Sequence, residues 1–257
     1  MKQFKTVNEA YQGILKDVRD NYEHKSSPRG LPIREITDYQ FRVANPTSGA
    51  IKTADESRNK KIASYTDKEF KLYNSGSNRV EDFAQASSFW NQLANPDGTV
   101  NSAYGFLIWN NRSVGHNEYE SLSKLGEHYK GEAGDFLRTP WEWAKNALIN
   151  DKDTRQAILR FSLPEHQWDG NKDQTCTMHG NFSIRDNKLN LSVVMRSNDI
   201  FFGLVYDMPW FVSIMERMCS ELKAKYPELS VGSYTHLAHS MHMYERDLEN
   251  INKMIGD

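Results

Sequence analysis

Residues 188–199 read KLNLSVVMRSND, a strand pattern that ends in a cluster of polar side chains. Successive residues of a strand point to opposite faces, so a run in which every second residue is apolar predicts a half-buried strand. The residues that share the predicted buried face are Leu189, Leu191, Val193 and Met195. The stretch therefore predicts a strand that delivers polar groups at its carboxyl end.

The polar cluster sets Arg196 beside Ser197 and ends at Asp199. A guanidinium fork and a hydroxyl can together donate several hydrogen bonds to the oxygens of a phosphomonoester, so the cluster is a candidate phosphate site. A strand end followed by a solvated polar turn would have the same composition. The stretch alone leaves both interpretations open.

Strand and helix patterns lie on both sides of this stretch. Alternation or apolar runs predict strands at 33–43, 156–163, 175–184, 188–195 and 231–244. Apolar residues at helical spacing predict helices at 6–22, 83–93, 139–150 and 209–226. Residues 45–64 are polar and predict a mobile surface loop, Thr66 and Glu69 fit a capping box, and 110–138 has no clear pattern. This order predicts a single α+β domain over 1–257, built on a large, mostly antiparallel or mixed sheet flanked by helices.

Composition and charge exclude several classes of protein. Of the 257 residues, 38% are hydrophobic and 26% charged, which excludes a disordered chain, and no apolar run approaches the roughly 18 residues that cross a bilayer. The formal net charge of −2 gives no general attraction to phosphate backbones, so direct nucleic-acid binding is not expected. Two cysteines and an amino terminus without the apolar stretch of a secretory signal favour the cytoplasm.

The two cysteines have different surroundings in the sequence. Cys176 lies at the start of a predicted strand, where a thiol facing a cleft can attack an electrophilic carbon if nearby positive charge lowers its pKa. Cys219 lies on a predicted helix between Met218 and Ser220, which favours a small buried side chain. A single cysteine is more often structural than catalytic, so residue type alone does not decide.

Three histidines raise the question of a metal site: His236, His239 and His242. On a strand His239 would face away from the other two, and at helical spacing all three would spread around the axis. Without a cysteine pair to complete a ligand set, no metal site is expected.

Taken together, residues 29–244 resemble the thymidylate synthase superfamily, and most of all its phage-type deoxycytidylate hydroxymethylase branch. The most specific part of the resemblance is 194–199 followed by Gly203 and Asp207. The resemblance implies a thymidylate synthase-like fold and a pyrimidine nucleoside monophosphate as substrate. It also implies 5,10-methylenetetrahydrofolate as co-substrate, a homodimer, no metal, and a place in the cytoplasm of a bacterium or of a phage-infected host.

Individual positions match the functional residues of the family. Cys176 matches its nucleophile, Arg196 and Ser197 its phosphate-binding pair, and Asp199 a carboxylate near the folate. Glu69 resembles the glutamate that organises water and proton transfer, although it could merely close a capping box.

Further matches lie along the chain. Trp90 matches an aromatic residue near the one-carbon unit, and Tyr104 a tyrosine beside the nucleophile. His242 and Tyr244 resemble the pair that holds the sugar hydroxyl. All four could instead be ordinary buried residues, and their joint order and spacing favour the functional interpretation.

Two arginines complete the implied phosphate site. Arg155 lies in a segment similar to the one that reaches a phosphate in the partner subunit, and Arg29 is a looser match to a further phosphate-binding arginine. The family usually has two arginines where this chain has Arg155 and Gln156, so a weaker or rearranged phosphate clamp is expected.

Asp207 stands where thymidylate synthases have asparagine, and the exchange indicates cytosine. An asparagine amide matches the donor and acceptor of a uracil edge, whereas a carboxylate accepts from the amino group and protonated ring nitrogen of cytosine. The implied activity is a hydroxymethyltransferase that acts on dCMP or CMP. The alternatives are a C5-methylase of a uracil or cytosine nucleotide, a uracil-nucleotide hydroxymethylase, and a nucleotide-binding protein without catalysis.

Overall fold

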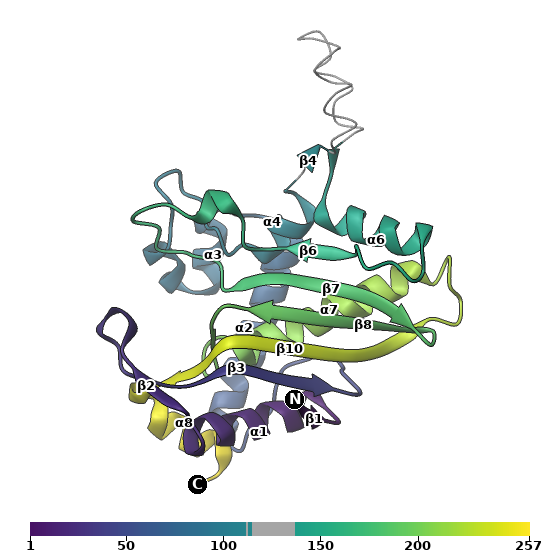
Figure 1. Cartoon of the computed structure of the whole chain (residues 1–257). Helices are drawn as coiled ribbons and strands as arrows, with labels where there is room; N and C mark the ends of the chain where they lie inside the picture. Colours follow the sequence, from purple (N-terminus) through teal and green to yellow (C-terminus); the bar gives the residue numbers. More distant parts are fainter. Residues whose placement is uncertain (112, 115–136) are drawn as a thin grey trace.

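A mixed eight-stranded sheet organises the computed structural model, which describes residues 1–111, 113–114 and 137–257 (Figure 1). The main path of the sheet is β1-β3-β10-β8-β7-β6, while β2 pairs with β3 and β9 with β10. These strands are β1 (Lys2–Phe4), β2 (His24–Ser26), β3 (Ile33–Val43), β6 (Ile158–Arg160), β7 (Thr177–Arg185), β8 (Lys188–Met195), β9 (Asn198–Asp199) and β10 (Ser230–Tyr244). A separate pair joins β4 (Ser113–Val114) to β5 (Leu137–Arg138). Antiparallel pairs β2–β3, β3–β10, β6–β7 and β7–β8 combine with parallel pairs β1–β3, β8–β10 and β9–β10, which confirms the predicted sheet.

Strand β10 lies in the middle of the sheet and aligns the segments that end in polar residues. Its parallel partner β8 pairs Val194 with Leu237, and β9 continues the same line by pairing Asp199 with His242. On its other side β10 runs antiparallel to β3, with His242 opposite Glu35. The polar cluster that follows β8 therefore lies beside the carboxyl end of β10.

Helices enclose the core on one side of the sheet, and in Figure 1 α2 and α7 lie behind the strands. The helices are α1 (Val7–Asp20), α2 (Glu56–Ser75), α3 (Val80–Ala86), α4 (Tyr104–Trp109), α6 (Pro140–Asn150), α7 (Leu204–Leu222) and α8 (Leu248–Ile255). The predicted buried face of β8 is buried, as are Trp210 and Phe211 of α7. Burying such a large side chain contributes about 1.5–3 kcal/mol, so this layer stabilises the sheet that positions the polar cluster. No helix within the described ranges combines the length and apolar character needed to cross a membrane.

Helix α2 corrects the second part of the loop predicted over 45–64, whereas 45–55 contain no helix or strand. The Asp55 side chain accepts a hydrogen bond from the backbone N–H of Arg58 at 3.0 Å and caps the helix, which then runs to Ser75. Thr66 and Glu69 consequently lie in the helix interior, and the predicted capping box there is wrong. The polar composition of 56–64 concealed the helix, because few of its residues are buried.

Other boundaries differ by shorter lengths. The predicted helix at 83–93 is two pieces, α3 and the 3-10 turn Ser88–Gln92, because the Ser87 side chain caps a new turn. Helix α7 begins at Leu204 rather than 209, so Pro209 lies inside it. Helix α6 begins as predicted, with a capping box between Thr139 and Glu142. Strand β6 is shorter than predicted, and β1, β2, α4 and α8 were not predicted. Most of 110–138 lies outside the described residues.

Candidate active site

Polar side chains from several elements meet near Asp207, in the first turn of α7. Burial raises the pKa of Glu69 on α2, Tyr104 on α4 and Cys176 before β7, and the nearby charge of Asp207 raises each of them further. The four groups are therefore electrostatic neighbours, although they are far apart in the sequence. The structure brings together all four residues that were predicted to be catalytic.

Cys176 is partly buried and lies directly before β7. The Arg196 Nη2 atom is 3.7 Å from the Cys176 Sγ atom, and Arg196 Nε donates to the carbonyl of Thr175 at 3.1 Å. Burial raises the pKa of the thiol to about 11, and the positive charge of Arg196 only partly opposes this effect. The expected cation is present, but burial outweighs it, so the thiol is protonated at neutral pH.

Glu69 is 7% exposed and belongs to the buried side of α2. The Tyr73 hydroxyl donates to Glu69 Oε1 at 3.5 Å. Burial and the charge of Asp207 raise the pKa of Glu69 to about 8, while hydrogen bonds from Tyr65 and Tyr73 act in the opposite direction. A carboxyl group that titrates near neutral pH can both give and take a proton during a reaction.

The Asp207 carboxylate accepts a hydrogen bond from the amide nitrogen of Asn198, with 2.8 Å between Nδ2 and Oδ2. Burial raises the pKa of Asp207 to about 6, and the Asn198 hydrogen bond opposes the rise. At neutral pH the group is therefore mostly ionised. An ionised carboxylate is a pure acceptor with room for about four hydrogen bonds, so Asp207 can accept two more donors from a ligand.

Tyr104 is fixed beside the segment that leads from Cys176 into β7. The Thr177 hydroxyl donates to the Tyr104 hydroxyl oxygen at 2.9 Å. A Cβ atom on Gly105 would lie 1.7 Å from the carbonyl oxygen of Tyr73, so only glycine lets α4 approach α2 this closely. The pair of residues 104 and 105 therefore locks the tyrosine between α2 and the nucleophile.

Asp199 and His242 face each other where β9 pairs with β10. The Asp199 carboxylate accepts from the backbone N–H groups of Phe201 at 2.9 Å and Phe202 at 3.3 Å. The Nδ1 atom of His242 is 3.2 Å from the carbonyl oxygen of Ser240, so donation there leaves Nε2 as an acceptor. A hydroxyl of a ligand could donate to this nitrogen.

Tyr244 ends β10 and packs edge-on against His242, with ring centroids 5.5 Å apart. The guanidinium of Arg246 covers its ring at 4.7 Å. Ser197 is partly buried and directly follows Arg196. Tyr244 therefore lies beside His242 at the carboxyl end of β10, and Ser197 belongs to the polar cluster that follows β8.

The two remaining arginines are exposed and differ in location. Arg29 lies in a short 3-10 turn with a left-handed φ of 55°, and its charge acts to lower the pKa of Cys176. Arg155 precedes β6, which is antiparallel to β7 and pairs Ile158 with Asn181. Arg155 therefore lies toward the end of β7 that is remote from Cys176, and the structure does not bring it to this chain's own site.

Trp90 reaches the site through a residue that the sequence analysis missed. Its indole nitrogen donates to the Tyr65 hydroxyl at 3.2 Å, and Tyr65 in turn hydrogen bonds to Glu69. Tyr65 lies one helical turn before Glu69, so their side chains are neighbours on α2. A prediction of α2 from the sequence would have indicated this contact. Asn198 is part of the stretch 188–199, but no sequence pattern indicates that its side chain contacts Asp207, nine residues later.

The histidines of β10 are arranged as expected for a strand. His236 and His242 are buried, whereas His239 is exposed on the other face. Burial lowers the pKa of His236 to about 3, and its Nδ1 atom is 2.7 Å from the Tyr234 hydroxyl. Among the described residues, no group of three or more histidine, cysteine, aspartate or glutamate side chains could hold a metal ion.

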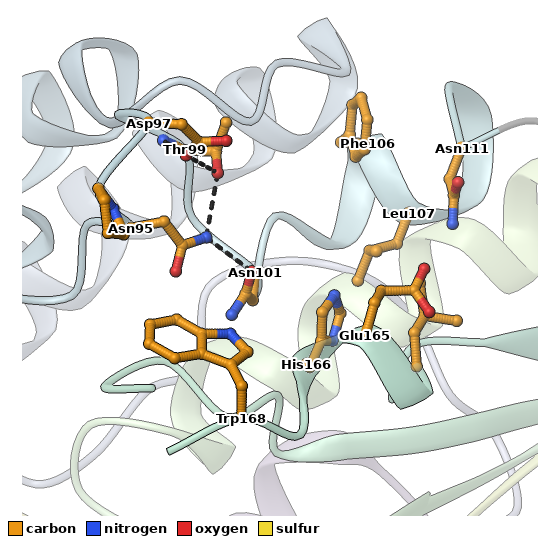
Figure 2. Close-up of a pocket in the computed structure, with 12 residues that line it drawn as sticks. Asn95, Asp97, Thr99, Asn101, Phe106, Leu107, Asn111, Glu165, His166 and Trp168 are labelled. Carbon is orange, nitrogen blue, oxygen red and sulfur yellow. Dashed lines mark hydrogen bonds between the residues drawn. The ribbon is translucent and has the colours of Figure 1, made fainter. Parts of the chain in front are cut away.

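A pocket of about 420 Å³ lies beside the segment that leads to Cys176 (Figure 2). Asn95 and Asn101 hydrogen bond to each other on one side of it, and His166 and Trp168 lie on the other. The His166 Nδ1 atom is 3.1 Å from the hydroxyl of Thr175. The residues that line this pocket do not include the groups around Asp207, so it borders the candidate site rather than forming it.

Known proteins resemble this chain over most of its length. A model of the thymidylate synthase family matches residues 9–256. The deoxycytidylate 5-hydroxymethyltransferases of Enterobacteria phages T6 and T4 are 30% identical over 190 residues, which cover 71% of this chain and 67% of each relative. The deoxyuridylate hydroxymethyltransferase of Bacillus phage SP01 is 26% identical over 248 residues, covering 90% of this chain and 56% of that protein.

The fold also matches a solved structure. The thermostable thymidylate synthase A from Bacillus subtilis is 20% identical in sequence and has a TM-score of 0.66. The match covers 97% of this chain and 84% of that one. This likeness shows the fold, and the sequence matches indicate the family.

Proposed function

The chain belongs to the thymidylate synthase family, and we propose that it makes a 5-hydroxymethylcytidine monophosphate from dCMP or CMP. The substrates are the nucleotide, 5,10-methylenetetrahydrofolate and water, and the products are the hydroxymethyl nucleotide and tetrahydrofolate. One carbon is transferred without a change in the oxidation state of the folate ring. The observation that supports cytosine is the carboxylate of Asp207 at the centre of the polar site.

Asp207 supports cytosine through hydrogen-bond complementarity. Its carboxylate already accepts from Asn198 and can accept from both the amino group and the protonated ring nitrogen of cytosine. A uracil edge would set its carbonyl oxygen against a carboxylate oxygen, and a mispaired buried edge costs about 1–3 kcal/mol. The expected discrimination is therefore roughly tenfold to over hundredfold. The 30% identical deoxycytidylate relatives of phages T4 and T6 favour the same base.

Cys176 is the proposed nucleophile. Its thiolate adds to carbon 6 of the ring, which makes carbon 5 nucleophilic toward the one-carbon unit. Because burial raises the pKa of the free thiol to about 11, addition requires the proton to leave as the nucleotide binds. Arg196, 3.7 Å from the sulfur, stabilises the negative charge that develops there.

Glu69 is the proposed proton carrier for hydration. Once carbon 5 has taken the carbon and lost its own proton, and the bond from that carbon to the nitrogen of tetrahydrofolate has broken, the base has an exocyclic methylene that water attacks. A carboxyl group with a pKa of about 8 can take a proton from that water. The oxygen stays on the new carbon, and the thiolate of Cys176 leaves carbon 6 to restore the aromatic ring.

The remaining groups are proposed to hold the substrates. Arg196, Ser197 and Arg29 offer donors to the phosphate, and His242 and Tyr244 offer partners to the sugar hydroxyl. Arg155 would reach the phosphate of a second copy in a homodimer, since it lies away from the nucleophile of its own chain.

The residues near Asp199 fit a folate. Its carboxylate can accept from pteridine N–H groups, and Phe202, whose N–H bonds to Asp199 and whose side chain is 54% exposed, offers aromatic surface. When bound there, the folate supplies the carbon as an electrophile.

A tritium-release assay tests the proposal. Nucleotides labelled at carbon 5 (CMP, dCMP, UMP and dUMP) are incubated in parallel, with and without methylenetetrahydrofolate, and the product mass is measured. We expect folate-dependent release from a cytosine nucleotide and a product heavier by one CH₂O unit. Cys176→Ser should abolish turnover, whereas Cys219→Ser, on α7 away from the site, should retain it. Full turnover by Cys176→Ser, or a methylated product, would reject the proposal.

A uracil nucleotide is the second candidate substrate. The deoxyuridylate hydroxymethyltransferase of phage SP01 matches over 90% of this chain, more than the deoxycytidylate 5-hydroxymethyltransferases do. Preferential release of tritium from UMP or dUMP in the same assay would select this alternative.

A further inference from the structure

Asn198 lies in β9 and points its side chain at the carboxylate of Asp207. It is 2% exposed, and its backbone is held by the pairing of β9 with Met241 in β10. Because an ionised carboxylate only accepts hydrogen bonds, the amide group that faces Oδ2 at 2.8 Å is the NH₂. The contact therefore has a definite direction: Asn198 donates and Asp207 accepts.

The local backbone is built around this contact. Gly203 stands between the two residues, and a Cβ atom there would lie 2.9 Å from Asn198 Nδ2 and 2.8 Å from the carbonyl oxygen of Asp199. The Asp207 N–H donates to the carbonyl of Gly203 at 2.9 Å, which fixes the first turn of α7. Glycine at 203 thus leaves the space through which the amide reaches the carboxylate.

We infer that Asn198 is a positioning residue that orients Asp207, keeps its carboxylate an acceptor, and thereby sets the preference for cytosine over uracil. The inference rests on the proposed function, since it concerns how that site selects its base. Asn198 occupies one lone pair of Oδ2, which leaves Oδ1 and the second lone pair of Oδ2 for the base. A proton on Oδ2 would weaken that oxygen as an acceptor, so the amide opposes protonation there.

The surroundings of Asp207 make this donor important. The titratable side chains whose electrostatics are linked to it all carry a negative charge when ionised: Glu69, Tyr73, Tyr104, Cys176, Asp199 and Tyr234. Burial raises the pKa of Asp207, and the negative charge of Asp199 raises it further. The hydrogen bond from Asn198 lowers it. Without the amide, more of Asp207 would be a neutral acid, which has one donor and one acceptor and so matches a uracil edge.

The test compares Asn198→Leu and Asn198→Ser with the wild-type enzyme and with a control, Asn190→Ala. Asn190 accepts from the backbone N–H of Ser233 at 2.8 Å, so its loss removes a polar contact from the same sheet away from the base. For each protein, kcat/KM for tritium release from dCMP and dUMP is measured between pH 5 and 9, together with the melting temperature.

We expect Asn198→Leu to lower the dCMP to dUMP ratio about tenfold and to move the acidic limb of the dCMP profile up by about one pH unit, the effect of one lost charge-assisted hydrogen bond. Asn198→Ser, which keeps a hydroxyl donor, should lie between Leu and wild type, and Asn190→Ala should change neither readout. If Asn198→Leu does not fold, the serine variant decides.

A folded Asn198 variant with an unchanged ratio or an unchanged acidic limb overturns the inference, because a merely structural amide would alter only the melting temperature. If the wild-type enzyme itself shows no preference for the cytosine nucleotide, the proposed function fails instead. The two failures are therefore distinguishable.

Discussion

Helix α7 packs against β8 and β10 of the sheet and helix α2 packs against α7, but the two helices bury different kinds of surface. Helix α7 buries a large, almost entirely apolar side that includes Trp210 and Phe211. Helix α2 is as long but buries only Ile62, Thr66, Glu69 and Tyr73. The buried side of α7 stabilises the fold, whereas that of α2 faces the candidate site, where polar groups have to be desolvated to be useful.

The difference has an energetic consequence. An apolar side chain gains free energy when it leaves water, while a buried carboxyl group costs free energy unless it is protonated or well bonded. Glu69 meets this cost through a pKa raised to about 8. Burial of Glu69 on α2 therefore lowers the stability of the fold at the residue that is proposed to carry a proton.

Glu69→Gln should have the largest effect on activity, because glutamine keeps the shape but cannot exchange a proton. We expect turnover to fall by roughly 10²–10⁴-fold, with little change in nucleotide affinity. The matched control is Glu56→Gln, an exposed position in the first turn of the same helix, which should retain turnover. Equal activity of the two variants would show that the buried side of α2 has no catalytic role.

Phe211→Ala should have the largest effect on stability. The side chain is fully buried against Tyr104, Phe161 and Trp210, so its removal leaves a cavity that costs about 3–5 kcal/mol. Phe89→Ala removes the same ring from a 55% exposed position and should cost far less. Urea denaturation of both variants measures the difference, and similar losses would contradict the role assigned to α7.

The buried carboxyl group of Glu69 on α2 should make the stability of the protein depend on pH. The pKa of Glu69 is raised from 4.5 to about 8 in the folded protein, so between these values the folded state holds a proton that the unfolded chain has released. Stability from this group is present below pH 4.5 and is lost as the pH rises toward 8, by up to a few kcal/mol. Glu69→Gln should lose less stability than wild type between pH 5 and 8 in urea denaturation. Parallel curves would mean that Glu69 has an ordinary pKa.

Thr66→Val should have the smallest effect. The Thr66 hydroxyl is buried on α2 and has no hydrogen-bond partner among the described residues. Valine has the same shape without the unsatisfied group, so we expect a gain of about 1 kcal/mol in the free energy of unfolding. A clear loss of stability would show that the hydroxyl is hydrogen bonded in solution, through an ordered water for example.

The same contrast explains how much of the fold could be predicted from the sequence. Strands β3, β7, β8 and β10 and helix α7 have apolar periodicity set by a buried face, and all were predicted within a few residues. Helix α2 was missed over 56–64 because its outer face is polar and its buried side is sparse. The helical period that predicts α7 starts at Pro209, although the helix begins five residues earlier, at Leu204.

The site shows a similar division. The resemblance to the thymidylate synthase superfamily implied that Cys176, Arg196 and Asp207 share one site, and the electrostatic linkage in the structure agrees. The Asn198 contact could not be expected, because it depends on where α7 begins and on the space at Gly203. The pKa of the Cys176 thiol could not be expected either. It depends on how far burial outweighs the charge of the Arg196 guanidinium, and the extent of burial cannot be read from the sequence.

Replacing one atom of Asp207 tests the central claim most directly. Asp207→Asn converts a carboxylate that accepts twice into an amide with one acceptor and one donor, while the shape and the other site residues stay the same. We predict that the ratio of kcat/KM for carbon-5 tritium release from dCMP to that from dUMP inverts, from a preference for cytosine to a preference for uracil. A variant that still prefers the cytosine nucleotide would contradict the assignment of Asp207 as the group that recognises the base.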